Sequence, residues 1–206
     1  MTATDTTTPA NGGQTASGAS SPITVTGLTN GDAYTFKVTA TGADGTGPAS
    51  SASSAVTPSG APGAPTGVSA TAGAASATVS FTAAAANGSP ITGYTVTATD
   101  TTTPANGGQT ASGASSPITV TGLTDGDVYT FTVTANNANG AGPASAASAP
   151  VTPLDLPGAP TGVSATAGAG SASVSFTAPS ANGSAITSYT VTATDTTTPA
   201  NGGQTA

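Results

Sequence analysis

Apolar and polar residues alternate strictly in several short runs of this chain. The clearest run follows Leu123, where Tyr129, Phe131, Val133 and Ala135 alternate with threonines. Because successive side chains of a strand point to opposite faces, this alternation predicts a strand with one face buried and the other in solvent. None of the runs has the spacing of an amphipathic helix.

Residues 64–153 contain further runs of the same kind, separated by glycine, proline and asparagine turns. The side chains expected to point inward are Val68, Ala70, Ala77, Val79, Phe81, Tyr94, Val96, Ala98, Ile118, Val120 and Val151, in addition to those above. About seven short antiparallel strands in roughly 95 residues predict an all-β fold, a β-sandwich.

The pattern recurs after 95 positions, because residues 2–29 are identical to residues 97–124 and residues 192–206 repeat residues 2–16. A repeat of this length indicates tandem domains. Met1 aligns with Val96 and Val191 inside an alternating run, which favours a piece of a longer array. The expected divisions are an N-terminal segment (1–58) with the last four strands of a unit, a linker (59–63), a complete central unit (64–153), a second linker (154–158) and a C-terminal segment (159–206) with the first three strands.

Composition excludes several classes of function. The chain has no cysteine, histidine, tryptophan, glutamate or arginine, and Lys37 is its one basic residue against eight aspartates, for a net charge of −7. Binding to nucleic acid or to an anionic membrane surface is therefore excluded, as are disulfides, thiolate metal sites and histidine-based catalysis. The chain has no run of 18 consecutive apolar residues, so the sequence predicts no membrane insertion. We expect no enzyme activity and no cofactor, and the uncharged polar surface favours an extracellular or cell-surface location.

Several motifs resemble the fibronectin type III domain along the whole chain. Two motifs are similar to its second half: Leu123-x5-Tyr129-Thr-Phe-x-Val-x-Ala135 and Asn139-Gly140-x-Gly142-Pro143-x-Ser145. Three others are similar to its first half: Pro65-x2-Val68, Val79-Ser80-Phe81 and Ile91-x2-Tyr94-x-Val96. The resemblance implies tandem fibronectin type III (immunoglobulin-like) β-sandwiches, truncated at both ends of the chain.

The resemblance also implies a tyrosine corner, in which a phenol bonds to nearby backbone and fixes the connection between the sheets. The residues that take this role are Leu28, Tyr34, Leu123 and Tyr129. Phe81 stands where the family usually has a core tryptophan, so we expect a smaller core and modest stability for each unit.

Candidate chemical sites are few. Asp125 and Asp127 flank Gly126 in a turn, but they offer too few oxygen ligands for a calcium loop. We expect every aspartate to lie in a solvated turn. Asn87-Gly88-Ser89 fits an N-glycosylation pattern, yet a plain turn explains it better.

The favoured function is a structural spacer or stalk in a larger secreted or surface-attached bacterial protein, because near-identical repeats suit length and mechanics better than a distinct site in each unit. One alternative is an adhesion or carbohydrate-binding module that uses the loops at 41–47 and 136–142, where the units differ most. Asn136, Asn137 and Asn139 are the candidate binding residues of that module, with a protein or a carbohydrate as partner. A further alternative is an accessory domain of a polysaccharide-degrading enzyme.

The two end segments are complementary, because each holds the strands that the other lacks. Each is expected to expose an unpaired sheet edge and half a core. Since the termini of a fibronectin type III domain lie at opposite poles, the sequence predicts head-to-tail association between molecules. The alternative is that both end segments stay disordered when the chain is expressed alone.

Overall fold

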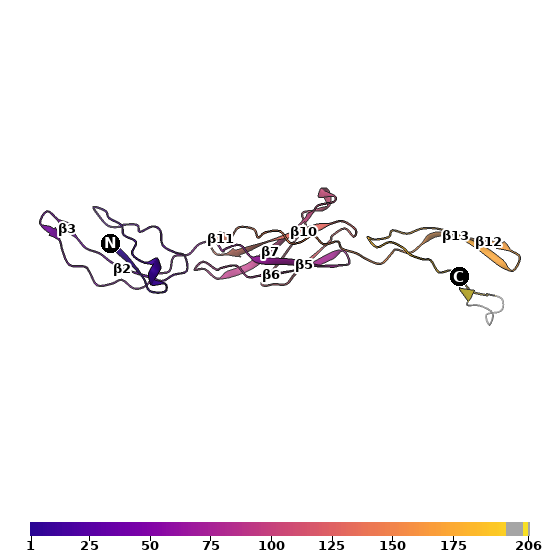
Figure 1. Ribbon diagram of the computed structural model, residues 1–206, viewed down its shortest axis with the longest axis horizontal. Helices are drawn as coiled ribbons and strands as arrows, with labels where there is room; N and C mark the ends of the chain where they lie inside the picture. The colour runs from indigo at the N-terminus through magenta and orange to yellow at the C-terminus, as the bar shows by residue number, and fades with distance from the viewer. Residues whose placement is uncertain (197–203, 206) are drawn as a thin grey trace.

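The computed structural model describes residues 1–196 and 204–205, which form three bodies in a row (Figure 1). The N-terminal segment lies at one end, the central unit in the middle and the C-terminal segment at the other end. Apart from two three-residue 3-10 helices, η1 (Pro9–Asn11) and η2 (Pro104–Asn106), the regular structure of the described residues is antiparallel sheet. The predicted all-β fold is confirmed.

The central unit is a sandwich of two sheets. One sheet has the strand order β5-β6-β9, with β5 at Thr66–Gly73, β6 at Ser76–Thr82 and β9 at Ile118–Thr121. The other has the order β11-β10-β7-β8, with β7 at Ile91–Asp100, β8 at Thr110–Gly113, β10 at Tyr129–Asn137 and β11 at Gly140–Ala141. The alternating runs of the sequence account for β5, β6, β7, β9 and β10, whereas β8 and β11 lie in stretches without alternation, and Val151, expected in a last strand, forms only an isolated bridge with Tyr129.

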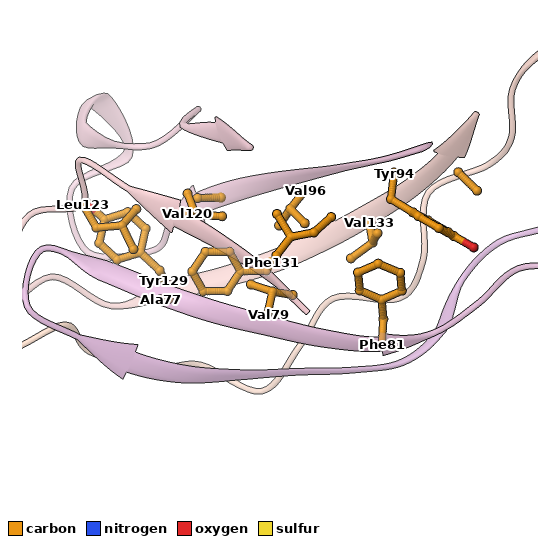
Figure 2. Close-up of a cluster of buried hydrophobic side chains, with 13 residues drawn as sticks. Ala77, Val79, Phe81, Tyr94, Val96, Val120, Leu123, Tyr129, Phe131 and Val133 are labelled. Carbon is orange, nitrogen blue, oxygen red and sulfur yellow. The ribbon is translucent and has the colours of Figure 1, made fainter. Parts of the chain in front are cut away.

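The core of the central unit lies between β6 and β9 on one side and β7 and β10 on the other (Figure 2). Burial alternates along the whole of β10, as its sequence requires. Phe81, in the position of the usual tryptophan, packs against Tyr94 with ring centroids 4.8 Å apart. The buried apolar side chains are Ala77, Val79, Phe81, Tyr94, Val96, Ala98, Ile118, Val120, Leu123, Tyr129, Phe131, Val133 and Ala135.

The end segments keep only some of the strands that the equivalent sequences form in the central unit. The N-terminal segment has β1 (Thr2–Asp5) paired with β2 (Tyr34–Lys37), and β3 (Thr41–Gly42) paired with β4 (Gly45–Thr46). The C-terminal segment has β12 (Thr161–Gly168) paired with β13 (Ser171–Thr177), and β14 (Thr192–Ala193) paired with β15 (Gln204–Thr205). Residues 23–26, whose equivalents form β9, form no strand because they have no counterpart of β6 beside them among the described residues.

The prediction that every aspartate lies in a solvated turn is wrong for two of them. Asp5 ends β1 and Asp100 ends β7, and each is only 2% exposed. The reason is local: the Asp100 carboxylate accepts hydrogen bonds from the backbone N–H groups of Thr102 and Thr103, both at 2.8 Å. A carboxylate that satisfies two backbone donors can be buried where a free one cannot.

Candidate functional site

The tyrosine positions singled out by the sequence connect the two sheets. Tyr129 is fully buried, and its hydroxyl oxygen accepts a hydrogen bond from the Thr124 N–H at 3.0 Å and donates to the Asn106 carbonyl at 3.3 Å. Leu123 lies beside this turn and is 4% exposed. In the N-terminal segment the Tyr34 hydroxyl accepts from the Thr29 N–H at 2.9 Å, so the bond from the phenol to the backbone is repeated.

A polar network surrounds each of these tyrosines. Asn106 Nδ2 donates to Asp127 Oδ2 at 2.8 Å, and Asp100 lies on the next strand. Burial raises the pKa of Asp100, but the N–H groups of Thr103 and Thr102, with Asp127 and Tyr129 beside them, outweigh this and hold its pKa below the ordinary value. The equivalent Asp5 has its pKa lowered by the same kinds of contact. The network therefore stabilises the turns around the two tyrosines.

The candidate binding loop at 136–142 overlaps the end of β10, and its second residue, Asn137, faces the linker rather than solvent. Asn137 is 7% exposed, and its Nδ2 donates to the carbonyls of Gly60 at 2.9 Å, Ala86 at 3.2 Å and Ser89 at 3.3 Å. Asn139 is exposed, and its Nδ2 also donates to the Gly60 carbonyl, at 3.2 Å. Both amides thus hold the linker against the central unit.

Asn136 is placed differently from its neighbours. Its Nδ2 is 3.4 Å from Thr95 Oγ1, across the sheet on β7, and it takes no part in holding the linker. In the N-terminal segment the positions of Asn137 and Asn139 are Gly42 and Asp44. The amides that hold the linker in the central unit therefore have no equivalent in the other copy of this loop.

The first linker is hydrogen-bonded to the turn at residues 85–88 of the central unit. The Gly60 N–H donates to the Asn87 carbonyl and the Gly63 N–H to the Ala85 carbonyl, both at 2.9 Å. Asn87 Nδ2 returns a bond to the Ala61 carbonyl at 2.8 Å. The linker is a docked strand of backbone rather than a free tether.

Two glycines close the same junction. The Gly31 N–H donates to the Pro58 carbonyl at 2.9 Å, and the Gly31 backbone lies against Gly88 of the central unit. A Cβ on Gly88 would collide with the Pro58 carbonyl oxygen and would lie 3.0 Å from Gly31 N. Only glycine allows this approach, and Gly88 also has a φ of 80°, which other residues rarely adopt.

The second junction repeats the first with a different linker sequence. Asn182 Nδ2 donates to the Leu156 carbonyl at 2.8 Å, and the Asn182 carbonyl accepts from the Asp155 N–H at 3.1 Å. Gly126 and Gly183 meet as Gly31 and Gly88 do, since a Cβ on Gly183 would lie 2.7 Å from Gly126 N. The interpretation of Asn-Gly-Ser as a plain turn missed this contact. The signal in the sequence was the fixed spacing from each linker to an identical Asn-Gly-Ser.

Of the residue types that commonly bind metal ions, histidine, cysteine, aspartate and glutamate, the chain has only aspartate. In the described part of the chain, no three aspartates lie close enough together to hold a metal ion. Over the same residues, no helix is long and apolar enough to cross a bilayer.

Comparisons with known proteins find one domain family and several solved structures of partial similarity. The sequence model of the fibronectin type III domain matches residues 63–151. The chain is similar to the FN1–FN3 domains of chicken CNTN1 (22% identity, TM-score 0.47, covering 85% of this chain and 63% of that one). It is also similar to titin kinase with its flanking domains (26%, 0.40, 46% and 18%) and to the twitchin kinase region of C. elegans (24%, 0.40, 46% and 18%).

The chain spans less than two thirds of the length of these solved structures. No curated protein matches it.

Proposed function

The chain contains a fibronectin type III domain at residues 63–151, and from this premise we propose that it is a non-enzymatic stiff spacer within a larger secreted or cell-surface protein. The observation that carries the proposal is the junction. Each linker is hydrogen-bonded to the following unit through an equivalent asparagine, Asn87 or Asn182. Each junction is also closed by an equivalent pair of glycines. A repeated, docked junction sets a fixed direction from one unit to the next.

Stiffness follows from what bending would break. Tilting the N-terminal segment away from the central unit separates Gly31 from Gly88 and pulls the Gly60 carbonyl from Asn137. Each lost hydrogen bond costs about 0.5–1.5 kcal/mol, so several together oppose bending far beyond thermal energy. A flexible linker of similar length would bend freely.

The alternative of a binding loop at 136–142 has less support from the geometry. Asn137 is buried and Asn139 donates to the linker, so two of the three candidate amides already have partners. Fibronectin type III domains serve both as structural and as adhesion modules, and the spacer role accounts for the contacts that these amides make.

Single-molecule distance measurement tests the proposal directly. The chain has no cysteine, so a dye pair can be placed on Ser54→Cys and Thr119→Cys, both exposed and on either side of the first junction. We expect one narrow distance distribution. Work at picomolar concentration keeps the molecules apart.

Gly88→Ala is the informative variant, because the new Cβ would collide with the Pro58 carbonyl. Gly122→Ala is the matched control: Gly122 has a φ of 74°, close to the 80° of Gly88, but nothing lies within 4 Å of its Cβ position. Both variants carry the same backbone strain. We expect a broad distance distribution for Gly88→Ala alone, and a broad distribution in the parent chain would reject the spacer.

The proposed location outside the cell rests on the exposed faces, which are built from threonine, serine and asparagine with few charges. Antibody raised against the central unit provides the test. Labelling of intact cells supports the location, whereas labelling only after lysis rejects it.

A further inference from the structure

Among the residues that the structure describes, buried side-chain oxygens without a hydrogen-bond partner occur at two positions of the central unit. They are Asp100 Oδ2 and Gln109 Oε1, and the equivalent atoms of Asp5 and Gln14 lack a partner in the same way. Asp100 is only 2% exposed, and its other oxygen, Oδ1, accepts two backbone N–H bonds. Since a buried acceptor without a partner is destabilising, these oxygens require a donor or a cation.

A second carboxylate lies beside Asp100. The register of β7 with β10 places Asp100 opposite Tyr129, and Asp127, two residues before Tyr129, is within hydrogen-bond reach of the Asp100 side chain. Asn106 Nδ2 holds Asp127 in this position by donating to its Oδ2 at 2.8 Å. Two carboxylates side by side repel each other unless a proton or a cation lies between them.

The central unit has no basic side chain that could supply the positive charge. Residues 64–153 contain no lysine, arginine or histidine, and Lys37, the one basic residue of the chain, lies on β2 of the N-terminal segment. Buried charges in proteins are paired with an opposite charge or coordinate a metal ion. The pair at Asp100 and Asp127 therefore takes up either a shared proton or a cation.

The amide of Gln109 favours the cation. Its Nε2 donates to the carbonyls of Asn106 and Gly122, so the nitrogen is fixed toward these acceptors and Oε1 is left as a free oxygen. The Tyr129 hydroxyl donates to the same Asn106 carbonyl, which places the Gln109 amide next to the carboxylate pair. A proton shared by two carboxylates would leave Gln109 Oε1 unpartnered, whereas a cation can be bound by all three side chains.

We propose that Asp100, Asp127 and Gln109 bind a calcium ion in the central unit. Every ligand is an oxygen, which calcium prefers, and the two carboxylates balance its charge. Magnesium fits less well, because it retains several waters in an octahedral shell and Asp100 is almost fully buried. With only two carboxylates we expect a dissociation constant of about 10⁻⁴–10⁻³ M, the range of extracellular calcium modules.

The sequence alone pairs Asp127 with the wrong aspartate. Asp125 is its neighbour along the chain, but Asp125 Oδ1 accepts the Ala75 N–H at 2.8 Å and belongs to another contact. Asp100 reaches Asp127 only through the pairing of β7 with β10. The same arrangement recurs 95 positions earlier, where Asn11 Nδ2 donates to Asp32 Oδ2 at 2.8 Å.

Terbium luminescence tests the site on the full chain. Terbium(III) replaces calcium at oxygen sites and emits light when a nearby tyrosine is excited, and Tyr129 lies opposite Asp100. All proteins in the test carry Asp32→Asn, which removes a carboxylate from the equivalent cluster of the N-terminal segment. We expect added terbium to give tyrosine-excited emission, and added calcium to displace the terbium.

Asp127→Asn is the informative variant. It removes one charge but keeps an oxygen for Asn106 Nδ2, so the turn retains its hydrogen bond. We expect its affinity for terbium and calcium to fall at least ~10-fold, because affinity at such sites depends on the number of charged ligands. Asp125→Asn is the matched control: it removes the same charge two residues away, the preceding unit carries Asn30 at this position, and its affinity should be unchanged.

Thermal unfolding provides a second measurement. Calcium at ~100-fold excess over its dissociation constant should raise the melting temperature of the central unit by several degrees, because the ion binds the folded state alone. Magnesium at the same concentration should raise it less. The rise should persist in Asp125→Asn and disappear in Asp127→Asn.

Three results would overturn the proposal. The first is an Asp32→Asn chain that gives no terbium emission, and the second is equal affinity in Asp127→Asn and Asp125→Asn. The third is a melting temperature that responds to pH but not to calcium, which would assign the pair a shared proton. The calcium site does not depend on the spacer role, so these results would leave the spacer proposal unchanged.

Discussion

At the scale of single residues, Tyr129 combines burial with a fixed hydrogen bond. The alternation of β10 directs its ring into the core, and the bond from the Thr124 N–H to its hydroxyl ties the preceding turn to the sheet. The alternation alone predicts the burial. The hydrogen bond between Thr124 and Tyr129 is expected only from the resemblance to the fibronectin type III domain and from the five-residue spacing of the two residues. Strand periodicity does not predict the hydrogen-bond partner of a tyrosine hydroxyl.

Tyr129→Phe tests this bond. The change keeps the ring and leaves the Thr124 N–H without its acceptor, so we expect the central unit to lose about 1–2 kcal/mol of stability, or several degrees in melting temperature. Calorimetry of the full chain measures it. Tyr94→Phe is the control, because Tyr94 packs through its ring, and a loss as large as that of Tyr129→Phe would show that the hydroxyl bond is not the cause.

The lowered pKa of Asp100 predicts how the stability of the central unit depends on pH. Its pKa is lowered in the folded state from an ordinary value of 3.8, with burial opposed by the N–H groups of Thr103 and Thr102 and by Asp127 and Tyr129. The unfolded chain therefore binds protons more readily than the folded chain as pH falls. The stabilisation is complete above pH 3.8 and is lost as pH falls through the lower, folded pKa.

Asp100→Asn removes this titration but keeps an oxygen for the two N–H groups. Melting temperature measured between neutral pH and acid should fall steeply in the parent chain and less steeply in the variant. Parallel curves would assign the acid sensitivity to other groups, of which Asp5, with its pKa lowered in the same way, is the first to examine.

At the scale of elements, the contacts of the asparagines at the end of β10 and in the following loop could not be predicted from the sequence. The asparagines at 136, 137 and 139 suggested a binding loop because they vary between units, and nothing in their pattern places Gly60 beside them. That contact joins residues 77 positions apart. The β-bulge between Asn136 and Asn137 turns the second side chain toward the linker and leaves the first on the sheet.

Asn137→Ala should therefore destabilise the central unit and loosen the first junction. It removes a donor from the carbonyls of Gly60, Ala86 and Ser89, for an expected loss of about 2–3 kcal/mol. Asn136→Ala is the matched control, with an expected loss below about 0.5 kcal/mol, because its single bond is long at 3.4 Å. Urea unfolding measures both, and equal losses would refute the assignment.

At the scale of the whole molecule, one sequence occurs in two environments. β5–β6 and β12–β13 are near-identical hairpins, yet the first is covered by the second sheet of its unit while β12 is exposed throughout. Since burial of one large apolar side chain contributes about 1.5–3 kcal/mol, the two hairpins should differ widely in local stability.

Hydrogen exchange compares them within a single molecule. In dilute solution the amide of Val174 should exchange at least ~10–100-fold faster than that of Val79, a ratio that corresponds to the burial of one such side chain. Equal protection of both in dilute solution would contradict the exposure of β12–β13.

Local patterns in the sequence predicted the sandwich, its five alternating strands, the inward residues and the 95-residue repeat, because alternation and turn residues act over a few neighbouring positions. The short strands β8 and β11 and the pairing of distant polar groups became known only from the three-dimensional structure. Asp100 is buried because backbone donors happen to face it, Asn137 holds a linker far away in sequence, and Gly88 is a glycine because the preceding unit presses against it. These contacts join residues distant along the chain, and local patterns carry no information about such distances.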